Sequence, residues 1–69
     1  MFIVSYRDND RFGFIAPHND SFRVWPEPVM MDADTAQKAA DYGSQFGTFG
    51  IENDELEFYP AVVNIVKVN

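Results

Sequence analysis

The constraint that most limits the fold of this chain is that 69 residues must be stabilised without a single cysteine. A chain of this length forms at most one domain, predicted over residues 1–69, and buries only roughly 60% of the surface that its unfolded form exposes. Small domains usually supplement such a core with disulfides, a metal or a partner subunit. Because disulfides and thiolate zinc sites need cysteine, close packing or association with another subunit must supply the stability.

Aromatic residues supply much of the material for this core. Seven Phe, three Tyr and one Trp make up 16% of the chain, and hydrophobic residues make up 46%. This composition is typical of a packed domain and not of a disordered segment. No apolar run approaches the ~20 residues that cross a bilayer, and the first residues lack the basic segment and cleavage site of a signal peptide. We therefore expect a cytoplasmic protein.

Short segments rich in β-branched and aromatic residues predict an antiparallel sheet. The predicted strands are residues 2–7, 11–16, 21–25, 55–59 and 61–68, whereas residues 17–20 and 48–54 are predicted as loops. Residues 29–31 are either a short edge strand or an extended lead-in. Alternation along residues 55–59 predicts that Leu56 and Phe58 point inward and that Glu55, Glu57 and Tyr59 share the opposite face. Phe12 and Phe14 are expected in the core.

One helix is predicted over residues 32–47, with Asp32 as its N-cap and Gly47 as its terminator. Its apolar stripe consists of small residues followed by one aromatic residue: Ala36, Ala39, Ala40, Gly43 and Phe46. Small residues let a helix lie close to a sheet. The predicted fold class is therefore α+β, a small single domain with an antiparallel sheet of four to five strands and one helix packed on one face, in the order β-β-β-α-β-β.

Negative charge is concentrated in the second half of the chain. The formal net charge is −6, and residues 27–57 carry eight acids against Lys38 alone. Such a field repels nucleic acid and anionic lipid and attracts basic surfaces. We therefore expect a basic protein surface as the partner, of the kind that handles nucleic acid, and no direct contact with nucleic acid or membrane.

Catalytic and metal-binding patterns are absent from the sequence. There is no phosphate-binding glycine motif and no Ser/His/Asp or Cys/His arrangement, and His18 is the only histidine. No compact loop offers the five to seven oxygen ligands that calcium needs. We therefore predict a protein that is not an enzyme and that uses no cofactor and no metal.

The stretch IENDELEFYP, residues 51–60, holds four carboxylates and no base, and two interpretations of it remain open. It is either a solvated face or an interaction surface. On a strand, Glu55 and Glu57 lie about 6.7 Å apart, which is close to the step between neighbouring phosphates of a nucleic acid. The acids of the helix would extend this array if helix and strand adjoin, and aromatic residues beside it could anchor a partner. The candidate protein-binding residues are Asp34, Asp41, Glu52, Asp54, Glu55, Glu57, Tyr59 and Trp25.

In size, charge and organisation the chain resembles small phage-encoded inhibitors of host machinery, including anti-CRISPR and anti-restriction proteins. No motif carries this resemblance, which is one of general class. It implies a viral inhibitor that acts as a nucleic-acid mimic by blocking a nucleic-acid-handling protein. The alternative is a structural or assembly module that self-associates through its apolar strands. A homodimer is compatible with either function.

Overall fold

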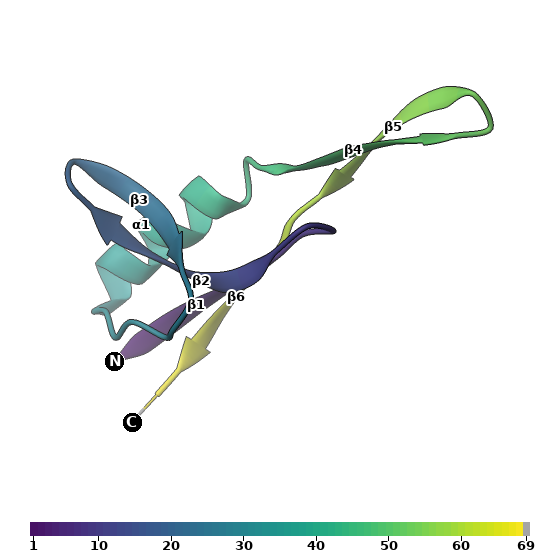
Figure 1. The fold of residues 1–69 in the computed structure, drawn as a ribbon. Helices are drawn as coiled ribbons and strands as arrows, with labels where there is room; N and C mark the ends of the chain where they lie inside the picture. The colour runs from purple at the N-terminus through teal and green to yellow at the C-terminus, as the bar shows by residue number, and fades with distance from the viewer. Residues whose placement is uncertain (69) are drawn as a thin grey trace.

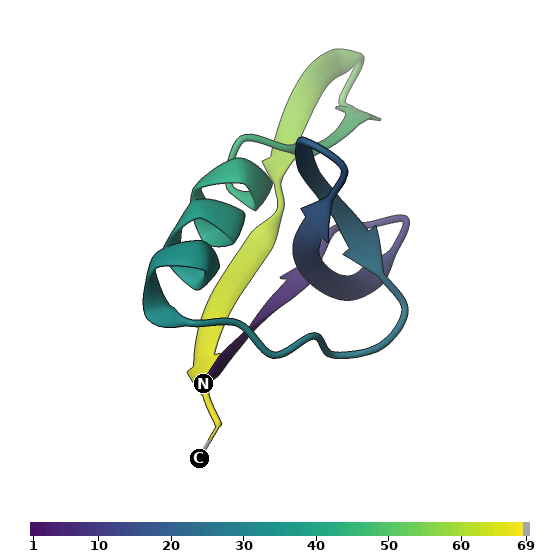
Figure 2. The same cartoon turned by 90° about the vertical axis from the view of Figure 1, so that its left-hand side faces the viewer.

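The computed structural model describes residues 1–68 as a four-stranded antiparallel sheet with one helix on one face, from which a two-stranded ribbon projects (Figures 1 and 2). The sheet has the strand order β3-β2-β1-β6. Its strands are β1 (Phe2–Arg7), β2 (Phe12–His18), β3 (Ser21–Trp25) and β6 (Val62–Lys67), and the helix is α1 (Ala33–Gly43). The α+β fold class predicted from the sequence is confirmed.

The ribbon consists of β4 (Gly47–Glu52) and β5 (Glu55–Pro60), which pair only with each other. We call residues 47–60 the ribbon and the remaining described residues the body. The prediction that residues 48–54 form a loop is wrong, because residues 48–52 belong to β4. The glycines at positions 47 and 50 interrupt the apolar alternation by which a strand is identified in a sequence. The two parts meet where the backbone N–H of Ala61 donates a hydrogen bond of 2.9 Å to the Phe46 carbonyl.

The helix begins as predicted and ends earlier than predicted. The Asp32 side chain accepts a hydrogen bond of 2.8 Å from the Thr35 backbone N–H, so Asp32 is the N-cap. The helix ends at Gly43, and Gly47 is not its terminator but the first residue of β4. A Cβ atom at Gly43 would overlap the Ile15 Cδ1 atom, so the Ile15 side chain would have to move to admit any larger residue there. Glycine and serine are poor helix formers, so residues 43 and 44 favour termination.

Small helix residues and larger sheet residues form the core together. Ala36 and Ala39 are fully buried on the face of the helix that packs on the sheet. Val4, Tyr6 and Ile15 contact this face from β1 and β2. Ala40 packs at the margin of this cluster and is partly exposed, and Phe46, predicted at the end of the helix stripe, lies beyond the helix and is exposed. The helix therefore packs closely on the sheet, as the small-residue stripe predicts.

Two connections in the body differ from the expected loops. Strand β2 continues through Pro17 and His18, and the turn to β3 is formed by Asn19 and Asp20. Pro17 is tolerated because β1 pairs with residues 12–14 of β2 and does not extend beside Pro17. Of the segment 29–31, Met31 forms an isolated antiparallel bridge with Phe2, and residues 29 and 30 are an extended lead-in to the helix.

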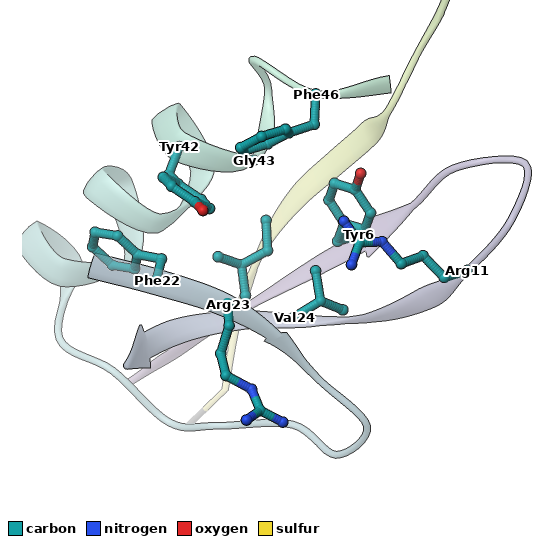
Figure 3. A pocket seen from close by; sticks show the side chains of 9 residues that line it. Tyr6, Arg11, Phe22, Arg23, Val24, Tyr42, Gly43 and Phe46 are labelled. Atoms are coloured by element: carbon teal, nitrogen blue, oxygen red, sulfur yellow. The ribbon is translucent and has the colours of Figure 1, made fainter. Parts of the chain in front are cut away.

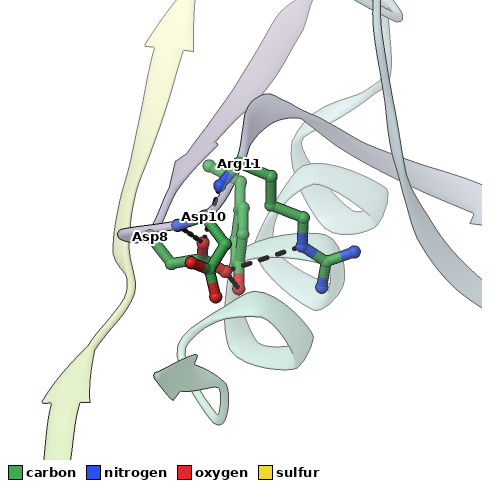
Figure 4. A network of polar contacts seen from close by, with 4 residues as sticks. Asp8, Asp10 and Arg11 are labelled. Atoms are coloured by element: carbon green, nitrogen blue, oxygen red, sulfur yellow. Dashed lines mark hydrogen bonds and ion pairs between the residues drawn. The ribbon is translucent and has the colours of Figure 1, made fainter. Parts of the chain in front are cut away.

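A hydrogen-bond network around Asp8 closes the turn between β1 and β2 (Figure 4). The Asp8 carboxylate accepts hydrogen bonds from the Tyr6 hydroxyl at 2.7 Å and from the backbone N–H groups of Asp10 and Arg11 at 2.7 and 2.9 Å. These hydrogen bonds, of which the one from Tyr6 has the largest effect, hold the pKa of Asp8 below its ordinary value of 3.8. Burial in the core is the larger cause that raises the pKa of Tyr6, and the hydrogen bond to Asp8 raises it further.

We predict that Ala39→Leu destabilises the protein by about 1–3 kcal/mol, because no space separates the helix from the sheet at this position. Lys38→Leu adds the same side chain on the exposed face of the helix and serves as the matched control. Urea denaturation of both variants measures the effect. Equal stabilities of the two variants would contradict the close packing of the helix.

We also predict that Asp8→Asn lowers the thermal midpoint at pH 7. An amide nitrogen in the place of the Asp8 Oδ2 atom cannot accept the hydrogen bond that the Tyr6 hydroxyl donates. A depressed pKa in the folded state stabilises the protein above the ordinary value of 3.8, and this stabilisation is lost as the pH falls through the folded-state pKa. The difference between variant and wild type should therefore shrink as the pH falls below 3.8 through the folded-state pKa. Asp10→Asn is the control, because the Asp10 carboxylate accepts no hydrogen bond within residues 1–68. A difference that persists in acid would contradict this role of Asp8.

Candidate protein-binding surface

The ribbon is a regular hairpin with a two-residue turn. Its strands pair from Gly47 opposite Pro60 to Glu52 opposite Glu55. Asn53 and Asp54 connect them with φ angles of 55° and 65°. Two successive positive φ angles are typical of the type I′ turn, whose twist matches that of paired strands. The turn residues of the ENDE sequence therefore fix the register and with it the face on which each ribbon side chain lies.

The two faces of the ribbon differ sharply in chemistry. Side chains alternate along each strand, and the register brings residues of one kind together. The apolar face consists of Phe49, Ile51, Leu56 and Phe58. The carboxylate face consists of Glu52, Glu55, Glu57 and Tyr59, together with Thr48. The predicted grouping of Glu55, Glu57 and Tyr59 on one face is therefore confirmed.

The prediction that Leu56 and Phe58 point into the core is wrong. Leu56 is 70% exposed and Phe58 is 46% exposed, and their cross-strand partners Ile51 and Phe49 are 79% and 68% exposed. The helix packs on β1, β2 and β6, and the ribbon extends beyond it, so no second layer covers the apolar face (Figures 1 and 2). The contact between Phe49 and Phe58, with ring centroids 5.0 Å apart, holds the strands together without burying either ring.

Tyr59 organises the carboxylate face. Its hydroxyl donates a hydrogen bond of 2.9 Å to the Glu52 carboxylate, and its ring lies over Gly50, where a Cβ atom would be 3.0 Å from the ring. Glu52 and Glu55 face each other across the two strands. Like charges placed directly opposite each other destabilise a strand pair. The face therefore maintains a concentration of negative charge that the ribbon itself does not neutralise.

The candidate residues predicted from the sequence lie in three separate places. Glu52, Asp54, Glu55, Glu57 and Tyr59 lie together on the ribbon, and all of them are exposed. Asp34 and Asp41 lie on the exposed side of α1. Figure 1 shows that the helix leads to the ribbon from its C-terminal end, so Asp34 lies at the far end of the helix. Asp34 therefore does not extend the acids of the ribbon, whereas Asp41 lies in the last turn of the helix, at the end that leads to the ribbon.

Trp25, the remaining candidate, lies at the end of β3 in the body and not beside the ribbon. It packs against the core while its Nε1 atom donates a hydrogen bond of 3.3 Å to the Ala16 carbonyl. The Arg23 guanidinium lies over its ring, with 4.0 Å between the guanidinium carbon and the ring centroid. Contacts within the body therefore account for the position of Trp25.

An exposed apolar stripe extends from the ribbon onto the body, and the sequence did not predict it. Residues of the same parity along β5 and β6 lie on one side, so Val62 and Val66 continue the side of Leu56 and Phe58, opposite the helix. Phe12 lies on the same side, but the exposed Arg7, which neighbours both Phe12 and Val62 in the sheet, lies between the two. The expectation that Phe12 lies in the core is wrong, since it is 64% exposed, while Phe14 is partly buried. We call the ribbon's apolar face plus Phe12, Val62 and Val66 the apolar stripe.

A pocket of about 160 Å³ lies between the end of the helix and strand β3 (Figure 3). Aromatic side chains of Tyr6, Phe22, Tyr42 and Phe46 line it, and Arg11 reaches its margin. Small-molecule sites usually measure about 300–1,000 Å³. Within residues 1–68 no three acidic or histidine side chains lie close enough to hold a metal ion. The ribbon is therefore the more prominent candidate surface.

Comparisons with family models, with curated proteins and with solved structures find no match to this chain. The helix of the described residues is too short and too polar to cross a membrane.

We predict that the turn residue Asp54 controls the stability of the ribbon separately from that of the body. Asp54→Val should destabilise the ribbon by about 1–2 kcal/mol, because a β-branched residue tolerates its φ of 65° poorly. Asp54→Gly, which removes the same charge, should not. Hydrogen exchange of the ribbon amides measures the difference, with Trp25 fluorescence as the control for the body. Unchanged protection in Asp54→Val would contradict the assigned turn.

Proposed function

We propose that this chain is a non-enzymatic binding protein whose ribbon blocks a basic surface of another protein, one that handles nucleic acid. The single observation that supports the proposal most is the carboxylate face of the projecting ribbon. Glu52, Glu55 and Glu57 stand there without a basic neighbour, and Asp54 extends the charge to the tip. Such an arm can enter a groove and present its carboxylates where phosphates would otherwise bind.

The shape of the molecule favours this use of the ribbon. The radius of gyration is 13.2 Å, whereas a compact chain of this length has about 11 Å. The molecule measures 45 × 25 × 19 Å along its principal axes, and Figure 1 shows the ribbon extending away from the body. An element that adds little to the core and much to the reach of the molecule is suited to contact with a partner.

The proposed partner follows from charge. The bases of the chain, Arg7, Arg11, Arg23, Lys38 and Lys67, all lie outside the ribbon, and the ribbon itself carries only acids. A surface with this sign attracts a basic groove and repels a nucleic acid. The class of small phage-encoded inhibitors, including anti-CRISPR and anti-restriction proteins, acts on such grooves, and we place this chain in that functional class as a viral protein of the cytoplasm.

A second candidate function is an assembly module, and the apolar stripe favours it. Four large apolar side chains lie exposed next to one another on the ribbon. Single exposed apolar residues are common on protein surfaces, whereas a contiguous group of this kind marks an interaction site. The two candidates differ in their response to salt. Binding through the carboxylate face should weaken steeply as salt rises, whereas association through the apolar stripe should respond little.

We predict that Glu55→Lys/Glu57→Lys abolishes binding to the basic partner while folding is retained, because these exposed acids contribute little to stability and each reversal opposes like charge across the interface. Proteins captured from a host lysate by the wild type and by the variant are compared at low and at high salt. Asp20→Lys/Glu27→Lys, which reverses two exposed acids of the body, is the control for the change in net charge.

The captured protein is then challenged with duplex DNA or RNA. Displacement by nucleic acid, together with loss of capture by the double variant, is expected from a groove that normally holds phosphates. Equal capture by wild type and double variant, or a capture that nucleic acid does not affect, would contradict the proposed function.

A further inference from the structure

We propose that two copies of this chain associate through the apolar stripe in a symmetric dimer, in which the ribbon of each copy lies along β6 of the other. This interface uses the side of the ribbon opposite the carboxylate face. The acids of both copies therefore remain outward and available to a basic partner. The inference does not depend on the proposed function, because it uses other side chains and predicts a different measurement.

The first observation is an excess of exposed surface. The accessible surface is 4936 Å². A compact monomer of 7.9 kDa exposes only about 4,400 Å² by the usual scaling of surface with mass. The apolar face of the ribbon contributes to this excess, because Ile51, Leu56 and Phe49 are the most exposed large hydrophobic residues that the structure describes. A two-stranded ribbon with one bare apolar face is at best marginally stable alone in water.

The second observation is the area of the apolar stripe. Its side chains range from 43% exposed at Val66 to 79% exposed at Ile51. With roughly 150–200 Å² for each fully exposed large side chain, the stripe presents about 700 Å². The largest apolar patch on a typical monomer is about 300–600 Å². A stable interface of standard size buries about 800 Å² on each partner, so the stripe and its immediate rim are sufficient.

The third observation is the matching length of the two halves of the stripe. Strands β5 and β6 each contain six residues and follow one another with only Ala61 between them. Each half is therefore about 20 Å long. A twofold axis near Ala61 would lay the ribbon half of one copy on the body half of the other, and the reverse contact would form by symmetry. The apolar side chains of the ribbon would then face Phe12, Val62 and Val66 of the second copy, together with Arg7 and Asn64, which share that face.

The charges are compatible with this antiparallel arrangement and not with a parallel one. The acids Glu52, Asp54 and Glu55 lie at or next to the tip of the ribbon, and Lys67 ends β6 at the opposite end of the stripe. In the antiparallel dimer, the two acidic tips lie at opposite ends of the interface, while the Lys67 side chain lies on the helix side of the sheet, as its pairing with Phe2 shows. In a parallel dimer, the two acidic tips would lie side by side and repel each other.

A second copy of the chain is a better match for the ribbon's apolar face than a basic protein surface is. The ribbon's apolar face carries no charge, so it offers a basic groove neither an ion pair nor a hydrogen bond. Burying the partner's charged groups against it would leave them unpaired. A second copy offers Phe12, Val62 and Val66 to this face, and the Arg7 side chain between Phe12 and Val62 keeps its guanidinium at the rim in water.

Sedimentation equilibrium of the purified full chain tests the proposal. The wild type should approach twice the monomer mass of 7.9 kDa as its concentration rises, at both low and high salt. Ile51→Ser/Leu56→Ser changes one cross-strand pair of the apolar face and should weaken dimerisation at least about tenfold. Both side chains are strongly exposed in the monomer, so the circular dichroism spectrum should remain that of the folded protein.

Two further variants separate the faces of the ribbon and the halves of the stripe. Glu55→Lys/Glu57→Lys alters only the carboxylate face and should remain dimeric. Phe12→Ser alters only the body half and should weaken dimerisation, because the ribbon of the second copy lies on it. A monomeric wild type at every concentration would overturn the dimer. A dimer that survives either Ile51→Ser/Leu56→Ser or Phe12→Ser would overturn the proposed interface.

Discussion

The close approach of a helix of small residues to the sheet is the contact on which the rest of this structure depends. Ala36, Ala39 and Gly43 bring α1 so near to β2 that Gly43 has no room for a Cβ atom beside Ile15. This contact gives a cysteine-free chain a dense core from few residues. The apolar face of the helix is fully occupied by this contact, so it cannot also cover the two-stranded ribbon. The ribbon is therefore left without a layer above or below it.

The sequence was informative about this contact because both partners have regular periods. The small-residue stripe of the helix and the β-branched and aromatic segments that form β1, β3 and β6 predicted the α+β fold and the side of the helix that is buried. The boundaries were harder, since Gly43 and Gly47 are both plausible helix ends from local propensity alone. Tertiary packing against Ile15 and the bond between Ala61 and Phe46 distinguish them.

The candidate surface could be predicted only in part, for a physical reason. Alternation shows which side chains share a face, and the grouping of Glu55, Glu57 and Tyr59 is correct on that basis. Alternation does not show whether another layer lies against the apolar face, and that information is absent from residues 47–60. Leu56 and Phe58 were therefore placed in a core that does not reach them. The two turn residues between alternating segments, Asn53 and Asp54, were the available signal for the hairpin.

The body and the ribbon, which are joined at Phe46 and Ala61, place different constraints on their residues. Residues of the body must preserve a core with little tolerance for added volume, so most changes there affect folding. Residues of the ribbon contribute little to that core, so a substitution at its exposed positions leaves the body folded. A lineage carrying this fold can therefore vary its ribbon and retain its body. Divergence should be fastest along residues 47–60 and slowest beneath the helix.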